Sequence, residues 1–166
     1  MLKHHIMAGL VFALLVICPA LSWADFVARV ITVQEGDRLT IRHDGLNEVI
    51  YLKDIDCPDL KQPYGKQAKR VVAAYVGNRD VVLRGLTRDK QGRVSAEVLL
   101  HDGRNVGQEL LKEGLAWWKK SASSDAGLEV LEELARAEGK GLWSEPNPVP
   151  PWKWKAPKKT SRKYSN

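Results

Sequence analysis

Apolar, strand-forming residues are concentrated in three segments of the first half of the chain, residues 26–33, about 39–41 and 48–53. The third segment alternates, with Ile50 and Leu52 on one face and Val49, Tyr51 and Lys53 on the other, and a period of two predicts a β-strand. Turn-forming residues separate these segments, and Asp44 followed by Gly45 is typical of a hairpin turn. We therefore expect a three-stranded antiparallel meander at the start of the domain.

The second half combines two further strand-like segments with apolar positions spaced three and four residues apart, which is the spacing of an amphipathic helix. Ser124 can cap the last helix. This order predicts an α+β fold, compatible with a five-stranded Greek-key barrel of the OB type with about three helices, although periodicity alone leaves other α+β arrangements open. We expect the strands at about residues 80–86 and 94–100, and the helices at about 64–76, 105–113 and 124–135.

The first residues have the parts of a signal peptide. Lys3 gives a basic start, residues 8–21 form a short apolar core, and Ser22-Trp-Ala24 is a small-x-small cleavage site. We expect residues 1–24 to be removed and the protein to be exported, to the periplasm or out of the cell. A retained N-terminal anchor is the alternative.

Basic residues gather at the other end of the chain. The net charge is +6, yet residues 25–143 hold equal numbers of basic and acidic side chains. We therefore expect one domain at residues 25–144 and a Pro-, Lys- and Trp-rich tail at 145–166, extended and mostly unstructured. The tail suits phosphate polymers or weak contact with an anionic membrane surface, and a merely solvated tail is the alternative.

Cysteine and histidine usage excludes several classes of protein. After cleavage only Cys57 remains, so the fold cannot be a disulfide scaffold. The remaining histidines are His43 and His101, which argues against zinc sites and histidine-based hydrolysis.

Several short motifs follow one another in a fixed order and carry the candidate chemistry. The motifs are Glu35-Gly-Asp37, Tyr51-Leu-Lys-Asp-Ile-Asp-Cys-Pro-Asp59, Gln62-Pro-Tyr-Gly-Lys-Gln-Ala68, Asp89-Lys-Gln-Gly-Arg93 and Glu113-Gly-Leu-Ala-Trp117. Together they resemble the patterns D-G-D-T, R-L-x-G-I-D-A-P-E, P-Y-G-x-x-A, D-x-Y-G-R and G-L-A of the staphylococcal nuclease family. The ordered set spans roughly residues 26–154 and is far more specific than any single motif.

The resemblance implies a Ca²⁺ site. Asp37 and Asp56 are expected at opposite edges of the meander as ligands, with the Cys57 carbonyl as a third, and calcium favours such oxygen shells. Phosphodiester hydrolysis needs a hard cation, a group that orients water and fixed positive charge, and carboxylates with guanidiniums can supply all of these. The alternative is that Asp37 lies in an ordinary turn and Asp56 caps a loop.

Arg93 matches the phosphate-binding arginine of the family, although an arginine after glycine in a turn is often only solvated. Two departures concern the catalytic residues. Tyr51 stands where the family has a second arginine, and Asp59 stands where it has the glutamate that acts on water. Lys53 is a candidate replacement for the missing charge, but its Cβ lies about 6.6 Å along the strand and it lacks the guanidinium fork. Arg38 adds a positive charge where the family has threonine.

For substrate binding, Lys90 matches a family position, and Trp117 with Trp118 could stack on a base; core packing is the alternative for both rings. The resemblance therefore implies a monomeric, calcium-dependent nuclease that cleaves DNA or RNA, preferentially single-stranded, with little sequence preference and no protein partner. Tyr51 and Asp59 weaken this expectation. The alternative is a catalytically decayed module that binds nucleic acid or the cell envelope.

Overall fold

The computed structural model describes residues 25–155. The expected signal peptide, residues 1–24, lies outside the described residues, as does the end of the basic tail from residue 156. No helix in the described part of the chain is long and apolar enough to cross a membrane.

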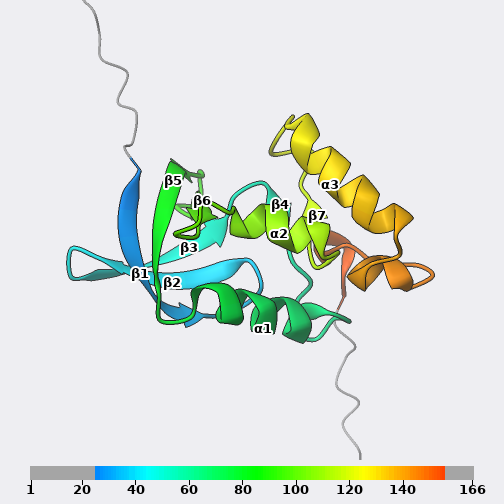
Figure 1. The fold of residues 1–166 in the computed structure, drawn as a ribbon, viewed down its shortest axis with the longest axis horizontal. Coiled ribbons are helices and arrows are strands. Elements are labelled where there is room, and N and C mark those ends of the chain that lie inside the picture. The colour runs from blue at the N-terminus through cyan, green and yellow to red at the C-terminus, as the bar shows by residue number, and fades with distance from the viewer. Residues whose placement is uncertain (1–24, 156–166) are drawn as a thin grey trace, which may run out of the picture.

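A closed five-stranded barrel forms the centre of the molecule (Figure 1), in the order β1-β2-β3-β6-β5. All neighbouring strands are antiparallel except β3 and β6, which run parallel. This arrangement confirms the predicted α+β fold with an OB-type barrel. The strands are β1 (Phe26–Val33), β2 (Arg38–His43), β3 (Leu46–Leu52), β5 (Asp80–Arg88) and β6 (Val94–Leu99).

Successive residues of β3 point alternately into the barrel and out of it. On β3, Ile50 and Leu52 are buried, whereas the side chains of Val49 and Tyr51 lie on the outer face. Because successive strand residues point to opposite faces, the outer face of β3 remains available for polar chemistry. Tyr51 faces Arg38 of β2 on one side and Ser95 of β6 on the other.

Two helices, α1 and α2, pack against the barrel, and α3 packs on α2. Figure 1 shows α1 running beneath the barrel and α2 between the barrel and α3. Asn105 caps α2 by accepting the N–H groups of Gly107 and Gln108. Asp125, and not the predicted Ser124, caps α3, because its carboxylate accepts the Gly127 N–H. The helices are α1 (Gly65–Val76), α2 (Val106–Lys112) and α3 (Ala126–Ala137).

A two-stranded sheet outside the barrel was not predicted. It pairs β4 (Ile55–Asp56) with β7 (Trp117–Trp118) in antiparallel register. Strands of two residues are too short to show a periodic pattern, so sequence reasoning cannot detect them. The pairing brings Lys119 next to the chain that follows β3, where the Lys119 N–H donates to the Asp54 carbonyl at 2.9 Å.

The C-terminal segment packs back on the domain as far as the structure describes it, whereas the sequence predicted an unstructured tail from residue 145. Gln62 Nε2 donates to the Val149 carbonyl at 3.0 Å, and the Trp152 ring lies 5.9 Å from that of Trp117. Prolines prevent regular helix here but do not prevent apolar side chains from packing. Two short 3-10 helices, Gly141–Ser144 and Pro151–Lys153, accompany this return.

Candidate active site

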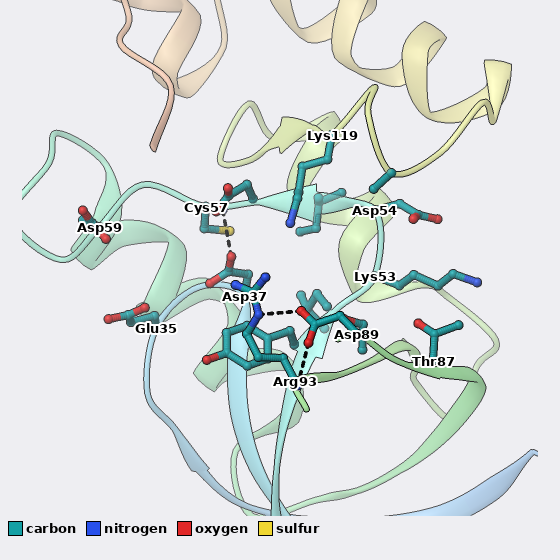
Figure 2. A pocket seen from close by; sticks show the side chains of 16 residues that line it. Glu35, Asp37, Lys53, Asp54, Cys57, Asp59, Thr87, Asp89, Arg93 and Lys119 are labelled. Carbon is teal, nitrogen blue, oxygen red and sulfur yellow. Dashed lines mark hydrogen bonds and ion pairs between the residues drawn. The ribbon is translucent and has the colours of Figure 1, made fainter. Parts of the chain in front are cut away.

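A cavity of about 440 Å³ opens where β3 ends. Four loops converge there: the β1–β2 turn, the segment around β4, the β5–β6 turn and the chain after β7 (Figure 2). The lining is strongly acidic. It contains the carboxylates Glu35, Asp37, Asp54, Asp56, Asp59 and Asp89 and the basic groups Lys53, Arg93 and Lys119.

Asp37 occupies the turn between β1 and β2, deep in the cavity. Its carboxylate accepts the Cys57 N–H at 3.2 Å, and its carbonyl accepts the Leu52 N–H at 2.8 Å. The preceding Gly36 allows this turn to lie against its neighbours, since a Cβ there would come within 2.9 Å of Cys57 Cβ and 2.7 Å of Ala68 Cβ. A side chain at position 36 would therefore push the Asp37 turn outward.

Asp37 and Asp56 form a half-buried acidic pair. Burial and the Asp56 charge raise the pKa of Asp37 from 3.8 to about 7. Burial likewise raises the pKa of Asp56, although the positive charge of Lys119 acts in the opposite direction. Two neighbouring carboxylates that are partly withdrawn from water are unfavourable unless a proton or a cation lies with them.

The chemistry of this pair fits a hard cation with oxygen ligands. Within residues 25–155, no three histidine, cysteine, aspartate or glutamate side chains gather in a metal-binding arrangement. A calcium shell also uses backbone carbonyls and water, so two carboxylates beside Cys57 suffice as its anionic part. The buried Cys57 thiol is a poor ligand, because burial raises its pKa well above the ordinary value and keeps it protonated.

Arg93 enters the cavity from the β5–β6 turn. Asp89 accepts the Arg93 Nε–H at 2.7 Å and two backbone N–H groups of the turn, from Gln91 and Arg93, at 2.9 Å each. Figure 2 shows the guanidinium directed toward Asp37. It also lies 6.0 Å from the centroid of the Tyr51 ring. The carboxylate thus fixes one edge of the guanidinium and leaves its Nη groups toward the cavity.

The structure brings Asp37, Asp56, Tyr51 and Arg93 together as lining residues of one cavity. Asp59 also lines the cavity but is exposed and lies at its edge, well separated from Asp89 in Figure 2. Its N–H donates to the Gln62 side chain at 2.9 Å.

Lys119 is the residue that sequence reasoning missed. It is half-buried, follows β7 directly, and Figure 2 shows its side chain pointing into the cavity. It forms no ion pair within residues 25–155, whereas its neighbour Lys120 pairs with Glu129 at 2.5 Å. Lys53, the replacement considered from sequence, points away from Asp37, and its Nζ lies beside Gly85. Lys119 is therefore the lysine that faces the acidic pair.

The residues predicted to bind substrate lie elsewhere. Lys90 is exposed in the β5–β6 turn, outside the cavity lining. Trp117 and Trp118 are buried, at 7% and 6% exposure, and neither lines the cavity. The Trp117 ring lies 4.4 Å from that of Trp143 in an edge-on arrangement. Base stacking by either ring stays a prediction, and their surroundings are those of core residues.

The molecule is a small closed barrel of five strands, and the cavity at the end of β3 is lined by carboxylates and an arginine, which suits a charged ligand. Comparison with known proteins identifies the family: the family model described as staphylococcal nuclease homologue matches residues 49–145. The chain therefore belongs to the staphylococcal nuclease family.

Several known proteins resemble this chain over most of its length. A protein of Escherichia coli described as an uncharacterized endonuclease is 36% identical over 138 residues, which cover 81% of this chain and 90% of the relative. A protein of Shigella flexneri named micrococcal nuclease is 29% identical over 159 residues, covering 90% of this chain and 91% of the relative. The protein ParB of Escherichia coli is 30% identical over 158 residues, which cover 89% of this chain and 88% of the relative.

Proposed function

We propose that this protein is a calcium-dependent nuclease that hydrolyses phosphodiester bonds of DNA or RNA with little sequence preference. The observation that carries the proposal is the cavity itself, where the half-buried acidic pair lies beside the inward-facing Arg93 and Lys119. Family membership and the names of the relatives support the same reaction class.

Asp37 and Asp56 would hold the cation, together with the Cys57 carbonyl. When bound, Ca²⁺ supplies Lewis-acid polarisation of a phosphoryl oxygen. The acidic pair suits this role because its two carboxylates already lie side by side in the cavity, so little of the binding free energy is spent on ordering them.

The basic residues would take the charge of the phosphate. Arg93 can donate two hydrogen bonds from its Nη groups, because Asp89 already holds its Nε in place. Lys119 approaches the cavity from the opposite loop and adds a point charge. The family has two arginines at this site, and Tyr51 replaces one of them. Lys119 would supply the second positive charge beside Arg93.

Asp59 and Tyr51 would take supporting roles. Asp59, at the edge of the cavity, can orient or deprotonate the attacking water, but its side chain is one bond shorter than that of glutamate. A displacement near 1 Å can lower a rate by about 100-fold. The Tyr51 hydroxyl can donate one neutral hydrogen bond. We therefore expect a slow enzyme.

A binding module without turnover is the second candidate, and the same two residues favour it. If Asp59 and Tyr51 together prevent catalysis, the cavity would still bind a phosphate beside its cation. The protein would then hold single strands in a salt-sensitive manner.

Cleavage of denatured DNA decides between the two candidates. Residues 25–166 are incubated with the substrate in calcium and in chelator, and acid-soluble nucleotides are measured. We expect slow release in calcium alone, and at least about 100-fold faster release by Tyr51→Arg with Asp59→Glu. No release by the natural chain at high concentration, with release by the double variant, would leave only the binding module.

We also propose that the chain is exported, to the periplasm or the medium, and acts as a monomer. The basic start, apolar core and cleavage site within residues 1–24 support export. Mass spectrometry of the native protein tests export: a mature N-terminus at Asp25 is expected, and an intact N-terminus on cytoplasmic protein would contradict it.

Deletion of residues 156–166 tests membrane contact by the basic tail, since the truncated protein would then leave the membrane fraction.

A further inference from the structure

A second groove, of about 480 Å³, lies beside the cavity. It crosses the outer face of β2 and β3 and reaches the β5–β6 turn. Tyr51 and Arg93 belong to both hollows, so the groove continues the cavity along the outside of the barrel. A linear ligand seated on Arg93 could therefore extend into the groove past Tyr51.

Basic side chains outnumber acidic ones in the lining of the groove, and the reverse holds in the cavity. The groove is lined by three guanidiniums, those of Arg38, Arg88 and Arg93, against the single carboxylate of Glu48. Carboxylates outnumber basic groups in the cavity. A cation thus suits the cavity, whereas an anion suits the groove.

Arg38 is a fixed charge at the β2 side of the groove. It stands opposite Tyr51 in the β2–β3 pairing, and its Nη2 lies 2.9 Å from Glu35 Oε1. The neighbouring Tyr51 and Glu35 side chains raise the pKa of Arg38, so it carries its charge at any physiological pH. Its buried Nε has no hydrogen-bond partner within residues 25–155.

Arg88 stands on the opposite wall, at the end of β5. Its Nη1 donates to the Gly92 carbonyl at 2.9 Å, and its Nη2 lies 2.9 Å from Glu48 Oε1. Both side chains of the Arg88–Glu48 pair are exposed, at 62% and 39%. Exposed ion pairs contribute little, so Arg88 can exchange Glu48 for a phosphate at small cost.

We propose that this groove is a second phosphate-binding site, which holds phosphates of a single strand where it continues beyond the cavity. Arg38 and Arg88 provide the charge, and the amide side chains of Gln34 and Asn47 provide neutral hydrogen-bonding groups along the same walls. That the anion is a nucleic-acid strand rests on the proposed function. The residues themselves do not depend on catalysis, since they lie outside the cavity lining.

Salt dependence of strand binding tests the groove separately from cleavage. Residues 25–166 are titrated with fluorescein-labelled single-stranded oligothymidylate in chelator, and the affinity is measured by anisotropy over a series of salt concentrations. Each phosphate contact adds about 0.7 to the slope of log affinity against log salt. We expect Arg38→Gln with Arg88→Gln to reduce the slope by about 1.4.

Two further double variants complete the test. Arg84→Gln with Arg104→Gln is the matched control, because both arginines pair with carboxylates on the surface at similar exposure, away from either hollow. It should keep the slope of the natural chain. Replacing the two groove arginines by lysine should also keep it, because the charge is retained.

The groove is overturned if the natural chain does not bind at low salt, if the glutamine variant keeps the full slope, or if the control loses as much. Loss of slope in the lysine variant would also overturn it, since charge would then not be the cause. If the natural chain cleaves DNA but the glutamine variant keeps the full slope, the proposed nuclease function stands and the groove proposal fails. If all slopes are as expected but the natural chain never cleaves, the groove proposal stands and the nuclease function fails.

Discussion

Asp89 Oδ2 accepts the Nε–H of Arg93 at 2.7 Å, and Asp89 Oδ1 accepts the Arg93 backbone N–H at 2.9 Å. One carboxylate thus fixes both the turn and the guanidinium that it presents to the cavity. The same arrangement recurs at Asp102, which accepts the backbone N–H of Arg104 at 3.1 Å and its Nε–H at 2.8 Å, outside the cavity. The molecule therefore contains its own control for the role of Asp89.

We expect Asp89→Asn to lower kcat/KM for single-stranded DNA by about 10-fold, because Arg93 loses its orientation but keeps its charge. Arg93→Gln should cost more, about 10²- to 10³-fold. Asp102→Asn should leave kcat/KM unchanged. Equal losses in the two aspartate variants would mean that turn stability, not Arg93, is responsible.

Lys119 is expected to act on the phosphate, because it is the lysine that faces the acidic pair. Lys119→Gln should lower kcat/KM by about 10²-fold, and Lys119→Arg should retain most of the activity. Lys120→Gln is the matched control, since Lys120 lies over the Trp118 ring at 5.0 Å and pairs with Glu129. Normal cleavage by Lys119→Gln would show that Lys119 does not act on the phosphate.

The half-buried Asp37 gives a distinct dependence of stability on pH. Its pKa is 3.8 in the unfolded chain and about 7 in the metal-free folded protein. Between these values the folded state holds a proton that the unfolded state has lost, so the free energy of unfolding falls as pH rises through this window. Asn at position 37 has no proton to lose.

In chelator, Asp37→Asn should therefore be more stable than the natural chain at pH 8, by on the order of 2 to 4 kcal/mol. Near pH 4 the two should differ little. Urea unfolding at both pH values measures this. Calcium at pH 8 should stabilise the natural chain and not the variant. A difference that is the same at both pH values would contradict the raised pKa.

Much of the fold could be predicted, because it depends on patterns that repeat. The alternation through Ile50 and Leu52 identifies the inner face of β3. Several such strands are compatible with a barrel, and the resemblance of the ordered motifs to one family favours the barrel over other α+β arrangements. The acidic pair and Arg93 could be predicted because each belongs to an ordered motif. The structure then supplies what the motifs cannot, which is the direction of each side chain.

The remaining features depend on contacts between segments far apart in the chain. Lys119 faces Asp56 because two-residue strands pair across about 60 residues of sequence, and such strands carry no pattern. Arg38 of β2 lines one groove with Arg88 of β5, although the two strands are not neighbours in the barrel, and a single strand does not reveal this. Trp117 is buried because Trp143 and Trp152 return to cover it.

The proposed function places strand cleavage at this cavity. Its sharpest test is the calcium-dependent initial rate on denatured DNA for the natural residues 25–166 and for Asp37→Asn, prepared identically. We expect a measurable rate for the natural chain that chelator abolishes, and a rate at least about 100-fold lower for the variant although it remains folded. Equal rates for the two proteins would overturn the proposed site, because the activity would then not come from it.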